Sequence, residues 1–480
     1  MVLALPAMAQ DKVVSKVLEL GKTDNRTMQH DDFLANRIGG RPIGSHNLQD
    51  AEAWAAECFR SWGLDVIVQE VGQINVGFSR GPWSGRMIGG QEMNLHFVTL
   101  SYTAGTKGPQ KGRVLVEPQS QQEFNSMKSA LKGAWVLVGG NSNGFPFDWS
   151  AAADAQRDSL KAVPAKERGE VPGLFYRDMV DAGVLGFIQA ADLPMQAHYD
   201  RKGCYNLTME NLPTVCEIKL DRSQYDVIKK MVRERRDFML EFNIRNNFFK
   251  GPVKYHNIIG VMKGSKYPDE YVLMGGHLDS YDVATGAVDD GNGVSVAMEA
   301  ARLLAQSGAK PKRTMMFCLW TGEEYGLLGS KFFVESKTVP LEKISNYFNR
   351  DGGPLAAAGV VVPEAMYDDF VKACEPILSY TADIPFTVSK RQGEARPRPT
   401  TAGGSDHAYF AMNGVPTISF SERDVKGYNF NYREIWHTES DNYDKVYPDY
   451  MEHSAVVTAV VAYGIANLPH LLSRNGLYKD

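Results

Sequence analysis

The sequence predicts an α/β fold: a mostly parallel central sheet with helices on both faces, plus an inserted β-rich segment. From about residue 253, strand-like and helix-like stretches alternate, which is typical of parallel sheets covered by helices. Short strand-like stretches and turns occupy residues 111–249 instead. The 480 residues are enough for roughly two to three domains. We therefore expect the main domain at 10–110 and 250–480, with an insert at 111–249 between them.

Apolar periodicity places the individual elements along the chain. Helical spacing predicts helices at 13–20 and 51–64, followed by a strand at 64–71. Strands of the insert are predicted at 112–117, 133–140, 183–190 and 212–220. The main domain continues with strands at 256–264, 271–277, 313–320 and 344–350, and with helices at 290–306 and 323–336. Residues 394–406 contain too much proline and glycine for regular structure, and we expect a loop there.

The composition excludes several classes of protein. Hydrophobic residues make up 43% and charged residues 23% of the chain, which excludes a largely disordered protein. A formal net charge of −5 lacks the basic excess of nucleic-acid-binding proteins, so we expect no nucleic-acid partner. The late apolar stretch at 455–466 is shorter than the about 20 residues that a membrane-spanning helix needs. It predicts a buried helix and no membrane span.

The first residues resemble the end of a secretory signal. An apolar run leads to Ala7-Met8-Ala9, which predicts cleavage after residue 9 and makes residues 1–9 a signal-peptide remnant. An apolar N-terminal arm is the alternative. Export to the periplasm or the extracellular space would permit disulfides, and Cys204 and Cys216 flank a turn-rich stretch and could pair. Cys318 lies in an apolar run and is predicted to be a core thiol.

Acidic residues and histidines follow several predicted strands of the main domain, at the point where each strand ends. The strand-end stretches are GGHLDS, TGEEYGLLGS and NRDGG; GAVDDGNG stands immediately before a predicted helix, and IWHTESDNYDKV comes much later in the chain. Because ligands collect at the carboxyl ends of parallel strands, we expect these side chains to converge. The residues are His277, Asp279, Asp289, Asp290, Glu323, Glu324, Asp351 and His437. So many carboxylates in one place would repel one another unless cations bind between them.

Two histidines and three carboxylates suit zinc in number and type. In a two-metal site, one carboxylate bridges ions about 3.5–4 Å apart, and each ion takes one histidine and one further carboxylate. A water shared by the ions loses a proton more readily, and a nearby carboxylate that binds no metal can act as general base. Adjacent residues that leave a strand point in different directions, so Glu323 and Glu324 suit this division of roles.

The motifs H-x-D, D-D-G-x-G and G-E-E-x-G, a strand-end Asp and a late His together resemble the M28 family of di-zinc exopeptidases. The resemblance is strongest to its secreted, carboxypeptidase Q-like branch, and it covers residues 253–446 well and the rest loosely. It implies a zinc exopeptidase fold with two Zn²⁺ per chain. For the insert it implies a protease-associated-like domain that acts as a lid and restricts the cleft to short peptides, with a simple packing domain as the alternative.

The resemblance also implies a ligand set. The implied metal ligands are His277, Asp289, Glu324, Asp351 and His437. Asp289 would bridge the two ions, and its peptide bond to Asp290 would be cis. From the residues alone, these two aspartates could instead cap the following helix. Strand-end Asp351 could be an ordinary turn residue.

Two residues would act without binding metal. Asp279 would orient the His277 imidazole, and Glu323 would be the general base. The alternative for Glu323 and its neighbour is a favourable acidic first turn of the predicted helix. Other histidines, such as His198, are predicted to be structural or solvated.

The sequence says less about which end of a peptide is bound. A carboxypeptidase needs a cation for the terminal carboxylate, and arginine can contact it in a bidentate manner. A glycine-containing loop could border the specificity pocket. The candidate substrate-binding residues are Ser405, Asp406, His407, Arg423, Tyr428 and Arg433.

We therefore expect an exported exopeptidase that hydrolyses short peptides as an aminopeptidase or dipeptidase, through a metal-bridged hydroxide with Glu323 as general base. A carboxypeptidase Q-like enzyme acting on dipeptides is the main alternative. From other classes, a glutaminyl cyclase-like acyltransferase would use one zinc ion, and a non-catalytic receptor-like relative would lack ligands. The expected partners are a short peptide and a second copy of the chain in a homodimer.

Overall fold

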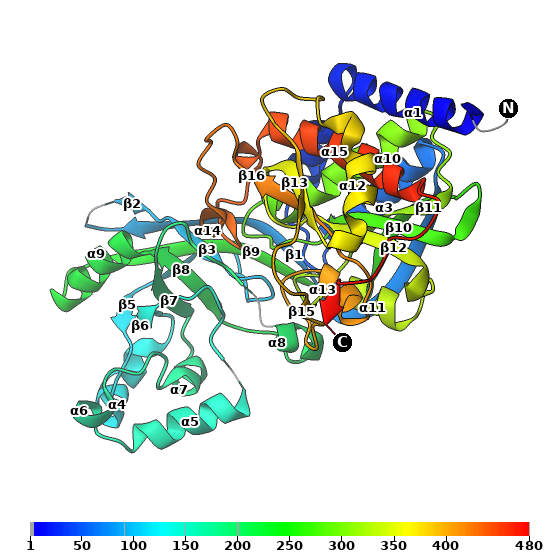
Figure 1. The fold of residues 1–480 in the computed structure, drawn as a ribbon. Helices are drawn as coiled ribbons and strands as arrows, with labels where there is room; N and C mark the ends of the chain where they lie inside the picture. Colours follow the sequence, from blue (N-terminus) through cyan, green and yellow to red (C-terminus); the bar gives the residue numbers. More distant parts are fainter. Residues whose placement is uncertain (1–3, 91, 149, 199–200, 480) are drawn as a thin grey trace.

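Two lobes of unequal size, joined by a long pair of strands, make up the chain (Figure 1). The computed structural model describes residues 4–90, 92–148, 150–198 and 201–479, without the side chains of 4–11 and 201–202. The predicted signal-peptide remnant, residues 1–9, therefore lies outside the fully described part, and its cleavage stays a prediction. The backbone from Ala4 onward belongs to the first helix, α1 (Ala4–Thr23).

A seven-stranded mixed sheet forms the centre of the larger lobe. Its strands are β1 (Asp65–Ile88), β2 (Met93–Asn94), β4 (Gln110–Gly112), β9 (Met239–Met262), β10 (Tyr267–His277), β11 (Arg313–Trp320) and β12 (Ile344–Asn349). They run in the order β12–β10–β11–β9–β1–β2, with β4 also paired to β9. Strand β10 is parallel to β11 and β12, but β9 is antiparallel to β11 and β1. The prediction of a mostly parallel sheet is therefore correct only for the three strands that end at the site.

Strands β1 and β9 form the ribbon that joins the lobes. Each has 24 residues, and they pair from Asp65–Val261 at one end to Ile88–Met239 at the other. The register shifts at three places along the pair, as expected where a long ribbon bends and twists. The sequence predicts only the first part of β1, because glycine and polar residues interrupt the apolar pattern further on.

Helices cover both faces of the main sheet. They are α2 (Thr27–Asp32), α3 (His46–Ser61), α10 (Asn292–Gln306), α11 (Leu328–Glu335), α12 (Tyr367–Cys374), α13 (His407–Met412), α14 (Tyr432–Ile435) and α15 (Pro448–Ala466). Alternate residues of β11 enter two different cores: Met315, Phe317 and Leu319 pack with α10 and α15, and Met316, Cys318 and Trp320 pack with α11 and α13. This burial on both faces confirms the prediction of a helix-covered sheet and of a core thiol at Cys318.

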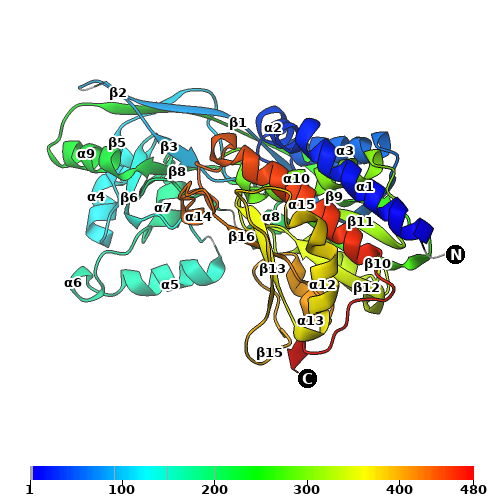
Figure 2. The same ribbon diagram turned by 45° about the horizontal axis from the view of Figure 1, so that its top comes forward.

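Shorter elements complete the larger lobe. A three-stranded sheet has the order β14–β13–β16, and a two-stranded one joins β15 to β17. Their bounds are β13 (Ala356–Val362), β14 (Thr387–Lys390), β15 (Arg396–Pro397), β16 (Phe420–Arg423) and β17 (Tyr478–Lys479). Helix α15 is buried along most of its length and packs against α10, with α1 lying beside it (Figure 2). In the part of the chain that the structure describes, we find no helix long and apolar enough to span a membrane.

The smaller lobe lies between β1 and β9 in the sequence. Its sheet has the order β3–β8–β7–β6–β5, in which β5 to β8 are parallel and β3 is antiparallel. Its elements are β3 (Phe97–Thr99), β5 (Val114–Val116), α4 (Gln121–Leu131), β6 (Trp135–Asn141), α5 (Ala151–Lys161), α6 (Ala165–Arg168), α7 (Tyr176–Asp181), β7 (Gly186–Ala191), β8 (Cys216–Asp221) and α9 (Arg222–Arg233). Helix α8 (Arg201–Asn206), which lies between β7 and β8 in the sequence, packs against the larger lobe. The insert is thus an α/β unit, and the expectation of a mainly β insert is wrong. A relation to protease-associated domains stays a prediction.

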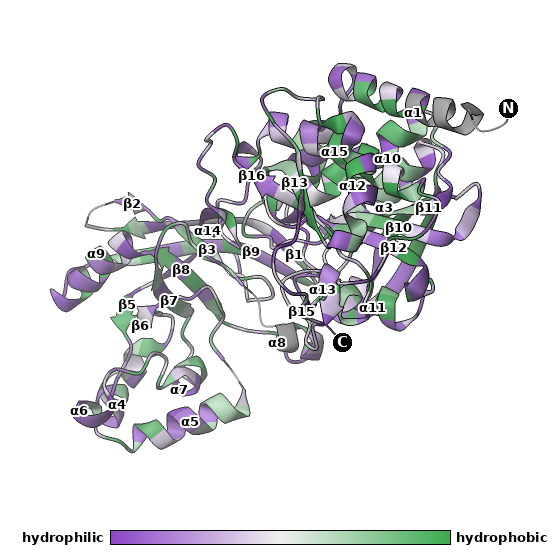
Figure 3. Ribbon diagram, in the orientation of Figure 1, coloured by the Kyte–Doolittle hydropathy of each residue, from purple (hydrophilic) through white to green (hydrophobic). Residues whose placement is uncertain are grey.

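Each lobe has its own main core, and a small apolar cluster that includes Ala191 and Val283 lies between them. Strand β6 of the smaller lobe places Trp135 and Leu137 against α9, and Val136 and Val138 against α4 and α7. Much of α9 is hydrophilic on the surface that faces away from this core (Figure 3). Cys204 packs in the core of the larger lobe and Cys216 in that of the smaller lobe, and no disulfide joins them.

Candidate metal centre and active-site cleft

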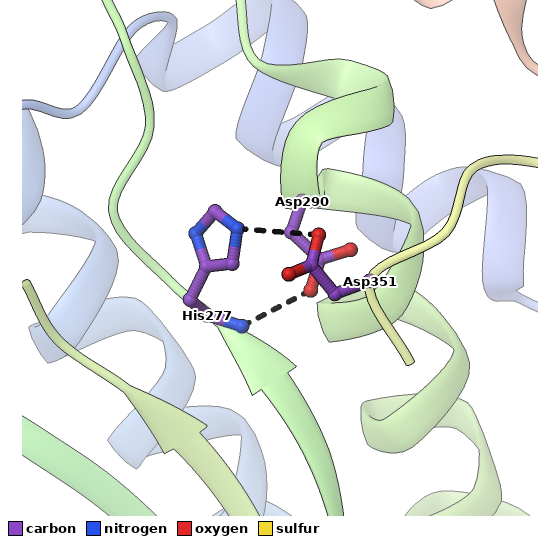
Figure 4. Close-up of side chains that lie close together, drawn as sticks. All are labelled: His277, Asp290 and Asp351. Atoms are coloured by element: carbon purple, nitrogen blue, oxygen red, sulfur yellow. Dashed lines mark hydrogen bonds and ion pairs between the residues drawn. The ribbon is translucent and has the colours of Figure 1, made fainter. Parts of the chain in front are cut away.

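His277 is the last residue of β10, and its ring is almost completely buried. Its Nε2 lies 3.2 Å from Asp289 Oδ1 and 3.6 Å from Asp351 Oδ1. Figure 4 shows the Asp351 carboxylate facing this ring. The other ring nitrogen, Nδ1, lies 2.8 Å from the carbonyl oxygen of Asp279. Because a carbonyl oxygen only accepts, Nδ1 carries the proton and Nε2 is left with a lone pair that points at the two carboxylates.

A second histidine meets the same carboxylate from the opposite side. His437 Nε2 lies 3.0 Å from Glu324 Oε2 and 3.6 Å from Asp289 Oδ2. One oxygen of Asp289 therefore faces His277 and the other faces His437. This is the arrangement that a bridging carboxylate requires. The structure also has the expected cis peptide bond between Asp289 and Asp290.

The donor set fits zinc. Buried Asp289 Oδ2 and Glu324 Oε1 accept no hydrogen bond, although buried carboxylate oxygens normally do. Burial, together with the nearby charge of Asp289, raises the pKa of Glu324 well above its ordinary value. Cations placed between these groups would give the two oxygens a partner and would stabilise the ionised form of Glu324. Imidazole nitrogens and carboxylate oxygens are ordinary zinc ligands. The five residues predicted as ligands thus lie in one cluster with donor atoms suited to zinc.

The segment with Glu323 and Glu324 differs from the prediction. The predicted helix begins only at Leu328, and both glutamates lie in the preceding turn. The Asp279 carboxylate accepts the backbone N–H of Glu323 at 3.0 Å and that of Glu324 at 3.2 Å, which accounts for this turn. Burial and the neighbouring acidic groups raise the pKa of Glu323 well above its ordinary value.

The predicted role of Asp279 is therefore corrected. Its carboxylate Oδ1 is 3.9 Å from His277 Nδ1, too far for a hydrogen bond, and its backbone carbonyl makes that contact instead. Asp279 thus orients His277 through the main chain and positions Glu323 and Glu324 through the side chain.

Two aspartates that lie beside the ligand cluster support the main chain around it. Asp290 Oδ2 accepts the backbone N–H of His277 at 3.0 Å (Figure 4), and Oδ1 accepts that of Gly293 at 3.1 Å. Asp441 Oδ1 accepts the N–H of Val288 at 2.7 Å, next to the bridging carboxylate. The sequence gives no sign of this role of Asp441. Its carboxylate accepts a hydrogen bond from a backbone N–H that lies more than 150 residues away in the chain.

A cleft of about 430 Å³ opens above the cluster. Four acidic residues and one histidine of the cluster line it: Asp289, Glu323, Glu324, Asp351 and His437. Its other walls are Gly326, Leu327, Ala402, Gly403, Gly404, Tyr409, Tyr432 and Trp436. Among the described residues, no lysine or arginine lines it. Tyr409 and Trp436 were not among the residues that the sequence suggests for substrate binding, because nothing in their local sequence distinguishes them from aromatic core residues.

The six candidate substrate-binding residues are not among those that line this cleft. Ser405 is buried and accepts a hydrogen bond from Asn349 Nδ2 at 2.9 Å. Asp406 is fully buried, which raises its pKa to about 7. His407 is partly buried at the start of α13, and Arg423, Tyr428 and Arg433 are exposed elsewhere on the surface. Their role in substrate binding therefore stays a prediction, and the loop meets the cleft through Ala402–Gly404, directly before Ser405.

His198, predicted to be structural, contacts the metal cluster. Its Nδ1 lies 3.1 Å from Nδ1 of His437, and both rings are buried. It comes from the smaller lobe, about 240 residues before its partner in the sequence, so spacing alone could not reveal the contact.

Comparisons with known proteins agree with this site. Residues 257–462 match the model of Peptidase family M28. Carboxypeptidase Q from Rattus norvegicus is 25% identical over 470 residues, which cover 97% of this chain and 90% of that protein. Carboxypeptidase Q from Homo sapiens is 26% identical over 471 residues, with the same coverage.

Solved structures share the fold along the whole chain. A peptidase M28 precursor from Shewanella amazonensis has a TM-score of 0.60 at 22% identity, covering 97% of this chain and 98% of that one. A zinc aminopeptidase from Bacillus subtilis has a TM-score of 0.53 at 18% identity, covering 95% and 97%. The family match spans the strands and loops that carry the ligand cluster described above. The chain is therefore a zinc metallopeptidase in which residues 257–462 match peptidase family M28.

Proposed function

We propose that this enzyme is a two-zinc exopeptidase that removes residues from the free amino end of short peptides. The observation that carries the proposal is the cleft, which has four carboxylates in its lining and, among the described residues, no cationic side chain. Two zinc ions would balance the four carboxylate charges, so the preference rests on the lack of a lysine or arginine among these lining residues that could pair with a terminal carboxylate.

Each ion would take one histidine. His277 and Asp351 would hold one ion, His437 and Glu324 the other, and Asp289 would bridge them, as the distances around Asp289 support. Bound zinc would supply positive charge that acidifies water and stabilises negative charge on the scissile carbonyl oxygen.

Glu323 is the residue proposed to move the proton. It lines the cleft and is held by Asp279 through its backbone N–H, so its carboxylate is free to face the reacting atoms. As general base it takes a proton from the attacking water, and as general acid it delivers that proton to the leaving amine. Tyr432 and Trp436, which also line the cleft, would pack against the substrate side chain and exclude water.

Carboxypeptidase action on dipeptides is the second candidate. The similarity to carboxypeptidase Q along 97% of the chain favours it. The two candidates overlap for a dipeptide, because its single peptide bond is reached from either end. They differ for a tripeptide, where an aminopeptidase releases the first residue and a carboxypeptidase the last.

The test uses zinc-loaded enzyme and a free tripeptide of three different residues, with products identified by mass spectrometry. Release of the first residue, together with no cleavage of the N-acetylated tripeptide, supports amine recognition. Release of the last residue, or cleavage of the acetylated peptide at the wild-type rate, contradicts it. An intact tripeptide with a cleaved dipeptide would restrict the enzyme to dipeptides.

A further inference from the structure

We propose that His198, a residue of the smaller lobe, is a positioning residue for the metal ligand His437. The inference rests on the proposed two-zinc function. It assigns the smaller lobe a part in building the metal site, beyond limiting the size of the substrate.

The ring contact has a defined direction of hydrogen bonding. His198 Nδ1 and His437 Nδ1 lie 3.1 Å apart, and the side chains are 3% and 7% exposed. A histidine that binds metal through Nε2 carries its proton on Nδ1. His437 therefore donates this proton, and His198 Nδ1 accepts it. The bond selects the tautomer of His437 and the rotation of its ring, with Nε2 directed at Asp289 and Glu324.

Backbone hydrogen bonds between residues 195–197 and 437–439 fix the positions of the two histidines relative to each other. The N–H of Ala197 donates to the carbonyl oxygen of His437 at 3.0 Å, and the N–H of Glu439 donates to that of Met195 at 3.0 Å. Gln196 and Thr438 form the antiparallel bridge between these bonds. His437 itself has a φ of 55°, a conformation that a non-glycine residue rarely adopts without such support.

The His198 ring is also held from its own lobe. Its backbone N–H donates to the carbonyl oxygen of Gly144 at 2.7 Å. Phe145 stacks on the ring with centroids 4.2 Å apart and an angle of 6°. A Cβ on Gly144 would lie 2.6 Å from His198 Cδ2, so the ring occupies space that only glycine leaves open at this position. These contacts orient His198 before any metal binds.

The test compares two substitutions of nearly equal size. In His198→Asn, the side-chain oxygen lies close to the former Nδ1 position and can still accept a hydrogen bond; in His198→Leu it cannot. Both remove the same ring packing. The measurement is the Kd of each zinc ion, by competition with a chromogenic chelator, with His437→Ala identifying the ion held by His437. Phe145→Leu controls for lost stacking, since Phe145 is half exposed and leaves the hydrogen bond in place.

We expect His198→Leu to raise the Kd of the His437 ion about 10–100-fold and to leave the other ion within about threefold. His198→Asn and Phe145→Leu should stay within about threefold for both. Equal losses of zinc affinity in the leucine and asparagine variants would overturn the proposal, and so would wild-type affinity in both. The proposed two-zinc function would still stand in either case, provided that the wild-type enzyme binds two zinc ions. Fewer than two ions in the wild type would overturn both. If His198→Leu does not fold, His198→Ala with added imidazole replaces it, and failure of imidazole to restore affinity overturns the inference.

Discussion

Replacement of Asp279 by alanine separates the role seen in the structure from the one that the motif implies. The Asp279 carboxylate accepts two backbone N–H groups, from Glu323 at 3.0 Å and Glu324 at 3.2 Å. A hydrogen bond to a charged group contributes about 1.5–3 kcal/mol. Loss of both at the lower value amounts to about 3 kcal/mol, which corresponds to about a 100-fold lower kcat if the turn holds the general base in place.

The assay measures kcat and KM with a chromogenic aminoacyl anilide, and zinc content by mass spectrometry. Asp279→Ala keeps the main-chain carbonyl that contacts His277, so the zinc ion at His277 should remain. Asp279→Asn keeps one acceptor oxygen and should lose about 10-fold in kcat. A kcat within threefold of wild type in Asp279→Ala would refute the reasoning. So would loss of the His277 ion, since that result would mean that the carboxylate orients the imidazole after all.

Three further predictions follow from the same groups. Glu323→Gln should lower kcat about 10²- to 10⁴-fold while zinc content stays unchanged; near-normal turnover would exclude Glu323 as the general base. A chelator should abolish hydrolysis and lower the melting temperature, because the buried carboxylates then face one another without cations, and added zinc should restore both. Burial raises the pKa of Glu217 in the smaller lobe from 4.5 to about 7, so the folded state binds an extra proton and its stability should fall as pH rises through that window. The melting temperature, measured between pH 5 and 8, should fall in this way in the wild type but not in Glu217→Gln. The same pH dependence in both proteins would contradict the prediction.

The ligand cluster could be predicted because each of its residues follows a recognisable local pattern. His277 ends an apolar strand, and the acidic pairs begin turns directly after strands or before a helix. Parallel strands bring such ends to one edge of a sheet, so local patterns were sufficient to place them together. The three strands β10, β11 and β12 are indeed the parallel part of the sheet.

Features that depend on distant main chain could not be predicted in this way. Asp441 and His198 act through contacts with segments about 150 and 240 residues away, and neither has a distinctive neighbourhood in the sequence. The sequence around Glu323 predicts the start of a helix. In the structure the Asp279 carboxylate accepts the backbone N–H groups of this turn, and the helix begins only at Leu328. Which residues of a loop face a cleft also depends on what packs over the loop: Ser405 is covered, whereas Gly404, its neighbour, lines the cleft.

Buried contacts connect the ribbon and the smaller lobe to the segments that carry the candidate metal ligands. Arg80, in the middle of the ribbon, forms a buried ion pair with Asp282 at 2.8 Å, and Ser101 Oγ donates to the same carboxylate. Asp282 lies only a few residues after Asp279, so this network joins the ribbon to the loop whose Asp279 carboxylate holds the turn at Glu323. Breaking a buried ion pair costs about 3–5 kcal/mol, and swinging the lobe away would also remove the contact between His198 and His437.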